Sequence, residues 1–383
     1  FKPENIYGID IDPLAVEITK ERIKKETGYI TNNIICDDFL ELCKNNSLGY
    51  YDYIYTNPPW GKKINKSQKI EYAEIFNAGI SQDTSSLFFF ACLNRLNSEG
   101  KLGLLLPEAF FNIASFESAR ERLFTYQIDT LKDYGKAFKG LQTGAVALEL
   151  TKIEMSSNRD IVCVYQNQTF LRSVASFINN PKKILNVNCN REESEVITYL
   201  YSQLHETLEG KASWGLGIVT GNNEKYVKSN AQKGFIPVYK GSDITLKGLK
   251  EPSHFISDDF SLYQQVAPQY LFKAKEKLIY KFISSNLCFF YDDKQRYPLN
   301  SANMLIVNKE FPVSMKVLAE LFNSELMNWL FKKLFNTHKV LRGDLEKMPI
   351  FTQFLTEDTF NEAEYLENIN IEKIENGTFR IKK

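Results

Sequence analysis

The tetrapeptide Asn57-Pro58-Pro59-Trp60 combines residue types that point directly to chemistry. It follows an apolar run that we expect to be a strand, and ligands bind at the carboxyl ends of strands in open α/β sheets. An amino group on a planar base is a poor nucleophile because its lone pair is delocalised into the ring. The side-chain oxygen of Asn57 and the carbonyl oxygen of Pro58, fixed in direction by the stiff Pro-Pro pair, can accept its two hydrogens. Trp60 offers a stacking face worth about 1 to 3 kcal/mol. The loop therefore predicts methylation of a flipped base, with a rigid structural turn at Pro58-Pro59 as the alternative.

Two acidic segments fit the binding of a nucleoside cofactor. Asp10 ends the first expected strand, where its carboxylate can accept hydrogen bonds from two ribose hydroxyls, and Ile11 can cover an adenine ring. Asp38 follows the second expected strand, where it can accept a hydrogen bond from an adenine amino group, and Phe39 can wall the pocket. Each segment also has a plainer interpretation, a capping or solvent-facing acid for Asp10 and a turn with a core Phe for the second.

Alternating strands and helices must position these residues. Such alternation over the first 150 residues is typical of an α/β fold with a parallel, doubly wound sheet. The expected strands are Asn5–Ile11, Ile34–Cys36, Tyr53–Tyr55, Leu102–Leu106, Leu131–Tyr134 and Ala145–Leu150, and helices are expected from Pro13, Ser85 and Phe116. Asp12 can cap the first helix, which should run to about Gly28. The last two strands are close enough in sequence to form an antiparallel edge pair.

The pattern changes near residue 190, which indicates a second domain. A helix is expected over Glu192 to Leu208, followed by short strands broken at Gly-Asn, Gly-Ser and Asn-Ser turns, and then a helix over Ser314 to Leu334. The whole chain has 47 basic and 47 acidic residues, but residues 211–350 hold 20 basic and 13 acidic ones. This excess indicates a domain that faces a polyanion, although ordinary surface variation is the alternative.

The composition excludes several classes of protein. A chain of 383 residues that is 43% hydrophobic and 25% charged is folded, neither disordered nor collagen-like. Its apolar runs fall short of the roughly 20 residues of a membrane span, and no secretory signal is visible at the start. The six cysteines contain no Cys-x-x-Cys pair, so we expect no metal site and no disulfide framework. A reducing cytoplasm is the expected location.

In this order, the segments resemble the gamma-class, TaqI-like and Eco57I-like N6-adenine DNA methyltransferases of restriction-modification systems. The matching segments are Tyr7–Pro13, Asp38-Phe39, Asn57–Trp60, Gly103–Pro107, Phe110–Asn112, Tyr134–Phe138 and, more loosely, Gly217–Asn223, Val238–Ile244 and Leu321–Ser324. The resemblance implies a Rossmann-like methyltransferase domain over residues 1–190, a mixed α+β target-recognition domain over 191–352 and a tail over 353–383. It also implies S-adenosyl-L-methionine as cofactor and double-stranded DNA as partner, with a restriction endonuclease domain or subunit as a further partner, in a prokaryotic cytoplasm.

The resemblance also assigns roles to residues. The implied catalytic residues are Asn57, Pro58, Pro59, Trp60 and Phe138, and the implied cofactor residues are Asp10, Ile11, Asp38 and Phe39. Phe138 would stack on the face of the flipped adenine opposite Trp60, with an ordinary core Phe as the alternative.

One family motif is missing from the sequence. A Gly-rich turn that approaches the methionine part of the cofactor precedes the Asp10 strand in the family, and its strand lies between the Asp10 and Asn57 strands. A sheet without that strand would leave backbone groups unpaired. We therefore expect that the chain is a fragment of a longer protein, that the strand is present but not among the given residues, or that another polypeptide supplies it. We also expect these residues alone to bind cofactor poorly.

Two other classes share part of the pattern. Methyltransferases that act on RNA or on protein glutamine carry similar Asn-Pro-Pro-aromatic loops, but they lack a basic C-terminal module of this size. A non-catalytic DNA-binding specificity protein would account for the missing motif, but the intact loop at Asn57–Trp60 argues against loss of activity.

Overall fold

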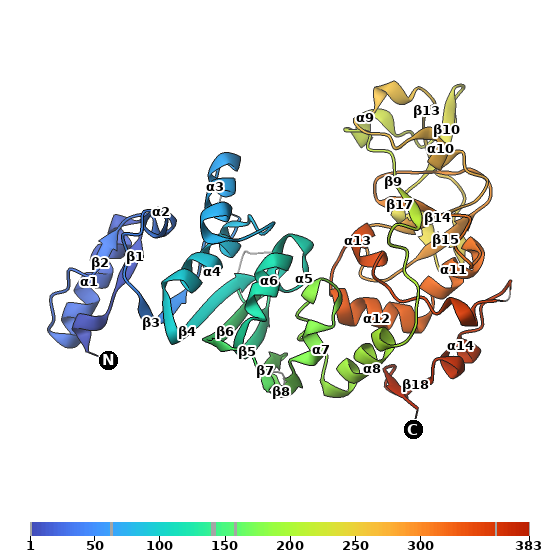
Figure 1. The fold of residues 1–383 in the computed structure, drawn as a ribbon. Coiled ribbons are helices and arrows are strands. Elements are labelled where there is room, and N and C mark those ends of the chain that lie inside the picture. Colours follow the sequence, from blue (N-terminus) through green and yellow to red (C-terminus); the bar gives the residue numbers. More distant parts are fainter. Residues whose placement is uncertain (1, 62–63, 139–142, 157–158, 357, 383) are drawn as a thin grey trace. The chain divides into compact units, whose positions relative to one another are not determined.

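The chain forms two compact units (Figure 1). The computed structural model describes residues 2–61, 64–138, 143–156, 159–356 and 358–382. The first unit comprises Phe1–Ile178 and Lys182–Val187, and the second comprises Asn179–Pro181 and Asn188–Lys383. No helix in these described ranges is both long enough and apolar enough to cross a membrane.

The first unit contains a six-stranded mixed sheet in the order β3-β4-β6-β5-β7-β8. Its strands are β3 (Tyr51–Thr56), β4 (Leu96–Pro107), β5 (Tyr126–Gly135), β6 (Ala145–Glu154), β7 (Asp160–Tyr165) and β8 (Gln168–Ser173). β3 is parallel to β4 and β5 is parallel to β7, whereas the other neighbours are antiparallel. The predicted antiparallel pair, β5 with β6, is confirmed, but its edge position is wrong because β7 pairs with β5 and extends the sheet. The α/β class is therefore confirmed, but the sheet is mixed beyond the predicted edge pair, because β4 also pairs antiparallel with β6 and β7 with β8.

Helices pack on this sheet around an apolar core. They are α2 (Phe39–Lys44), α3 (Lys66–Phe76), α4 (Thr84–Arg95), α5 (Ala109–Asn112), α6 (Glu117–Leu123) and α7 (Ala175–Ile178). The carboxylate of Asp83 caps α4 by accepting from the backbone N–H of Ser85 at 2.9 Å. Leu87 and Phe89 of α4 are fully buried, as is Leu106 of β4 in the same cluster. Each such side chain contributes about 1.5 to 3 kcal/mol, so α4 is a rigid support for β3 and β4.

The first elements form a separate two-stranded layer. β1 (Gly8–Asp10) pairs in parallel with β2 (Ile34–Cys36), and α1 (Pro13–Thr27) connects the two strands. Asp12 caps α1 and Gly28 ends it in a left-handed conformation, which confirms the predicted boundaries. Val16 and Ile34 are buried here but lie outside the main cluster of the unit. A two-stranded sheet with so small a core is marginal alone.

The second unit combines short sheets with helices. A four-stranded antiparallel sheet has the order β15-β14-β17-β9, and a three-stranded sheet has the order β13-β10-β16. Its strands are β9 (Ala212–Leu216), β10 (Phe235–Tyr239), β11 (Ile244–Thr245), β12 (Gly248–Leu249), β13 (His254–Ser257), β14 (Lys277–Lys281), β15 (Phe289–Asp292), β16 (Tyr297–Pro298), β17 (Ala302–Val307), β18 (Ile371–Lys373) and β19 (Phe379–Ile381). Its helices are α8 (Arg191–Ser202), α9 (Asn223–Tyr226), α10 (Gln269–Phe272), α11 (Met315–Phe322), α12 (Glu325–Phe335), α13 (Arg342–Leu345) and α14 (Glu362–Asn368).

Two predicted helices of this unit need correction. The helix predicted over Glu192–Leu208 ends at Ser202. The single helix predicted over Ser314–Leu334 is wrong, because the chain breaks at Asn323-Ser324 into α11 and α12. The Asn323 side chain bonds both backbone groups of Phe289 in β15, and Ser324 caps α12. The contact of Asn323 with β15 ends the first helix, and the cap by Ser324 starts the second.

A buried ion pair joins β14 to the edge strand β15 of the four-stranded sheet, at the end of their pairing. Lys277 Nζ lies 2.6 Å from Asp292 Oδ2, and both side chains are 0% exposed. Arg296 Nη1 lies 2.8 Å from the other oxygen of Asp292. Burial alone would raise the pKa of Asp292, but its hydrogen bonds and charge interactions with Lys277 and Arg296 outweigh burial and lower it.

Candidate active site

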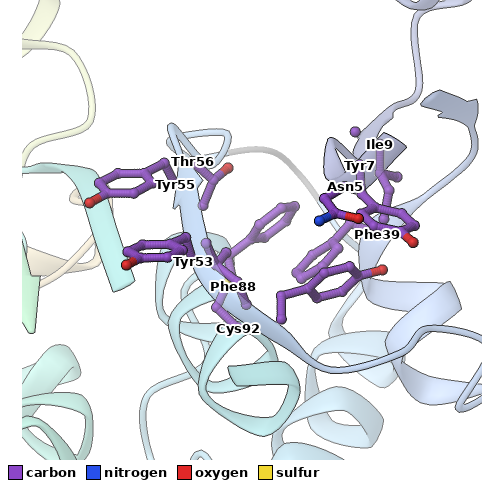
Figure 2. Close-up of a pocket in the computed structure, with 12 residues that line it drawn as sticks. Asn5, Tyr7, Ile9, Phe39, Tyr53, Tyr55, Thr56, Phe88 and Cys92 are labelled. Carbon is purple, nitrogen blue, oxygen red and sulfur yellow. The ribbon is translucent and has the colours of Figure 1, made fainter. Parts of the chain in front are cut away.

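A cavity, which we call the slot, separates β1 from β3, the strands that lead to Asp10-Ile11 and the Asn57–Trp60 loop. β1 pairs with β2 and β3 pairs with β4, but within the described residues β1 and β3 are not hydrogen-bonded neighbours. The slot, of about 200 Å³, lies between them, and Figure 2 shows its lining. The lining residues are Asn5, Tyr7, Gly8, Ile9, Phe39, Tyr51, Tyr53, Ile54, Tyr55, Thr56, Phe88 and Cys92. This gap lies where the resemblance puts the missing central strand.

Aromatic side chains dominate the walls of the slot. The rings of Tyr7 and Tyr51 meet edge to face with centroids 5.3 Å apart, so β1 and β3 approach each other through side chains. Phe39 packs against Phe88 of α4 at 5.2 Å. The side chain of Tyr53, on the edge strand β3, is 53% exposed. Within the described residues, the facing edges of β1 and β3 therefore meet through aromatic side chains and not through strand pairing.

Sequence reasoning missed several of these lining residues. Tyr53 and Tyr55 lie two residues apart on β3, and this spacing places them on one face of the strand, whereas the register shifts between Tyr51 and Tyr53. That spacing was a usable signal. Phe88 of α4 is half-buried and carried no local signal that separates it from the buried residues of the same apolar helix.

The predicted cofactor acids lie in local capping geometry at the ends of β1 and β2. Asp10 Oδ1 accepts from the backbone N–H of Asp12 at 2.9 Å, and Asp10 is exposed. Asp38 Oδ1 accepts from the backbone N–H of Leu40 at 2.9 Å and so caps α2. Of the four predicted cofactor residues, Phe39 lines the slot, whereas Asp10, Ile11 and Asp38 do not belong to its described lining.

The predicted catalytic loop leaves β3 at its carboxyl end. Asn57 is exposed, Pro58 is buried and Trp60 is half-buried. The indole Nε1 of Trp60 donates to the carbonyl oxygen of Leu105 in β4 at 3.3 Å, which ties the loop to the sheet.

The structure brings Trp60 and Phe138 together although 77 residues separate them in sequence. Their ring centroids are 6.1 Å apart with an interplanar angle of 75°. Phe138 is 41% exposed, so it is not an ordinary core Phe. The rings meet edge to face, and a base can therefore enter between them only when one ring turns.

Gly135 and Gly144 flank Phe138 in the sequence and have defined contacts of their own. Gly135 has a φ of 57°, and its N–H donates to Asp133 Oδ1 at 2.6 Å. Burial raises the pKa of the Asp133 carboxyl. Gly144 accepts through its carbonyl from the backbone N–H of Glu108 at 2.9 Å, and a Cβ at Gly144 would lie 2.3 Å from a Glu108 carboxylate oxygen. These contacts fix the backbone at Gly135 and at Gly144.

Comparisons with known proteins agree with the motifs in both units. Residues 4–139 match the Eco57I restriction-modification methylase family, and residues 236–350 match the TaqI-like C-terminal specificity domain. The chain is 48% identical over 248 residues to the Type II methyltransferase M.VspI of Vibrio sp. (strain 343), covering 65% of this chain and 60% of that protein. The predicted resemblance to restriction-modification methyltransferases is confirmed. The chain spans about 60% of the length of this relative.

Solved restriction-modification enzymes have a similar fold. The Type IIL enzyme MmeI in complex with DNA matches with a TM-score of 0.56 at 13% identity, over 93% of this chain and 56% of that chain. The ATP-dependent Type ISP enzyme LlaBIII bound to DNA matches with a TM-score of 0.54 at 11% identity, over 87% of this chain and 33% of that chain. At these identities the likeness supports the fold alone.

Proposed function

We propose that the chain carries the catalytic loop and the recognition part of a site-specific DNA adenine methyltransferase. The observation that carries this proposal is the contact of Trp60 with Phe138 beside Asn57 and Pro58, at the carboxyl end of β3. The family matches in both units and the M.VspI relative add support.

In this proposal Asn57 and Pro58 make the target amine reactive. The side-chain oxygen of Asn57 and the carbonyl oxygen of Pro58 accept the two hydrogens of the adenine N6 group, which favours its pyramidal form. Pro58 is buried, so its carbonyl direction is fixed by its surroundings as well as by Pro59.

Trp60 and Phe138 hold the flipped base. The bond from Trp60 Nε1 to Leu105 keeps the indole attached to β4, whereas the Phe138 side chain is 41% exposed. We therefore assign the turning ring to Phe138, which opens a gap over Trp60 as the base arrives. Stacking worth about 1 to 3 kcal/mol offsets much of the cost of extracting the base.

S-adenosyl-L-methionine is the proposed methyl donor. The residues fit its adenosine part, because Asp10 presents an exposed carboxylate at the end of β1 and Phe39 presents an aromatic wall. When bound, the cofactor supplies an electrophilic methyl group. The slot of about 200 Å³ is smaller than the roughly 300 to 1,000 Å³ of typical ligand sites, so these residues alone form an incomplete cofactor site.

Duplex DNA is the proposed partner of residues 191–352, with residues 1–190 as the catalytic part and 353–383 as a tail. The excess of basic over acidic residues at 211–350 supports this division. A restriction endonuclease domain or subunit is the further partner that a restriction-modification system supplies.

A methyl-transfer assay with three substrate classes tests the proposal. Protein expressed from the intact gene is incubated with labelled S-adenosyl-L-methionine and duplex DNA, RNA or a protein mixture, and the labelled nucleoside or amino acid is identified by chromatography. We expect label in N6-methyladenine of DNA, loss of it in Asn57→Ala, and retention in the control Asn97→Ala, whose amide bonds Asp52 away from the loop. Label confined to RNA or protein, or no label at all, contradicts the proposal.

A further inference from the structure

The second unit contains a larger cavity, of about 600 Å³, outside the site described above. We call it the hairpin pocket. Its three walls are the tip of the β11–β12 hairpin at Thr245–Lys247, the connection from β14 to β15 at Lys281–Cys288, and the α11–α12 junction at Asn323–Asn328.

Two asparagines fix the geometry of these walls. Asn323 accepts from the N–H of Phe289 at 2.8 Å and donates to its carbonyl at 2.9 Å. Asn328 accepts from the N–H of Leu287 at 2.8 Å and donates to the carbonyl of Ser324 at 3.1 Å. Because both amides are used by the backbone, the pocket is preformed, and these side chains are committed to holding it.

The charge in the pocket is positive and uncompensated. Lys247 and Lys281 line it, and neither has an ion-pair partner within the described ranges of the chain. The lining carboxylate, Glu325, pairs with Lys373. The backbone N–H of Lys281 donates to the carbonyl oxygen of Cys288 at 3.1 Å, and both residues line the pocket. Two ammonium groups in one concavity attract an anion.

The rim of the pocket is apolar and faces solvent. Leu246, at the hairpin tip, is 68% exposed, and Ile283, in the β14–β15 connection, is 64% exposed. Ile283 forms an isolated antiparallel β-bridge with Lys339, which is also exposed. The cavity is larger than a phosphate alone and falls in the range of sites for larger ligands. Lysine ammonium groups can bind phosphates, and exposed aliphatic side chains beside them can contact sugars. Phosphates and sugars alternate in this way along a nucleic-acid strand.

We propose that the hairpin pocket holds the sugar–phosphate backbone of duplex DNA, with Lys247 and Lys281 at phosphates and Leu246 against a sugar. The identity of the polyanion as DNA rests on the proposed function. The contact is independent of base sequence, because lysine contacts to phosphate position a duplex without reading it.

The test measures DNA affinity of the whole chain, so a failure to methylate does not affect it. Fluorescence anisotropy with a labelled duplex is recorded over a salt titration for Lys247→Gln with Lys281→Gln. Each phosphate contact contributes about 0.9 to the slope of log affinity against log salt, which at 0.15 M is about 5-fold in affinity. We expect the double variant to bind about 30-fold more weakly, with a slope smaller by about 1.8, equally on two duplexes of unrelated sequence.

The matched control is Lys294→Gln with Lys309→Gln. Both lysines are exposed, and the strand register puts them at the opposite end of the β14–β15–β17 sheet from Lys281. We expect binding close to that of the unchanged chain. Replacement of Lys247 and Lys281 by Arg should restore affinity, because Arg keeps the charge.

Three results overturn the proposal. One is a double variant that binds DNA like the control, and another is a failure of the arginine variant to restore binding. The third is calorimetric binding of inorganic phosphate that the double variant loses with unchanged DNA affinity, which assigns the pocket to a free anion. If the double variant unfolds in a thermal scan, Leu246→Asp at the exposed tip replaces it, and unchanged DNA affinity of that variant also contradicts the proposal.

Discussion

Replacing Asp292 by Asn should strongly destabilise the second unit, because it leaves the ammonium of Lys277 buried without its counter-charge. The two groups lie 2.6 Å apart at 0% exposure. Asp292 also accepts from the backbone N–H groups of Lys294 at 3.2 Å and Arg296 at 2.8 Å, so the change disturbs a network. Removing one partner of a buried pair costs about 3 to 5 kcal/mol. With a urea slope of about 2 kcal/mol/M, the unfolding midpoint should fall by roughly 1.5 to 2.5 M.

Urea titration followed by tryptophan fluorescence measures this shift, since Trp214 and Trp329 both lie in the second unit. The control is Glu195→Gln, which breaks the pair with Arg191, whose two side chains are 74% and 59% exposed. A surface pair contributes about 0 to 1 kcal/mol, so its midpoint should barely move. Equal shifts in Asp292→Asn and the control would refute the reasoning.

The same pair predicts the direction of acid unfolding. The pKa of Asp292 is lowered in the folded state. Its stabilising contribution is therefore fully present above its ordinary pKa of about 3.9 and is lost as the pH falls through the lower, folded-state value. The urea midpoint of the unchanged chain should drop below about pH 4, and this part of the drop should be missing in Asp292→Asn. Parallel pH profiles of the two proteins contradict the assignment.

Three further changes test the site. Asn57→Ala should lower the methylation rate by roughly 100-fold or more without loss of cofactor binding, measured in single turnovers, and near-normal turnover excludes the proposed role. Asp10→Ala should weaken S-adenosyl-L-methionine binding by about 1.5 to 3 kcal/mol in calorimetry on protein from the intact gene, and unchanged affinity leaves Asp10 with only its local turn. Gly103→Ala puts a Cβ 2.4 Å from two ring carbons of Tyr55, whereas nothing lies within 4 Å of a Cβ in the control Gly49→Ala. The melting temperature of Gly103→Ala should therefore be a few degrees lower than that of the control. Equal melting temperatures of the two variants contradict the packing of Gly103 against Tyr55.

Elements with strong local signals could be predicted from the sequence. Asp12, Pro13 and Gly28 define the ends of α1 through capping and a left-handed residue, and these depend on neighbouring atoms alone. The break between α11 and α12 could not be predicted in this way, because the bonds of Asn323 to Phe289 join residues 34 positions apart.

The sheet order was only partly predictable for a similar reason. The pairing of β5 with β6 follows from their closeness in sequence, but the edge is decided by β7 and β8. Those strands form a hairpin at Gln166-Asn167, both with positive φ, and the place of this hairpin in the sheet depends on the pairing of β7 with β5, about 30 residues away in sequence.

The candidate site shows the same contrast. The place of Asn57 at a strand end followed from the residues just before it, whereas the contact of Trp60 with Phe138 depends on the whole sheet between them. Asp38 was predicted as a cofactor residue, and the structure adds that one of its oxygens caps α2.

Single-molecule sequencing of DNA from cells that express the intact gene is the most direct test of the central claim, because it reports the modified base and its sequence context together. The proposed function predicts N6-methyladenine at one recurring sequence, present with the unchanged gene and absent with Asn57→Ala. Genomic DNA without N6-methyladenine, or a mark that persists in Asn57→Ala, contradicts the claim that the loop at Asn57–Trp60 methylates adenine.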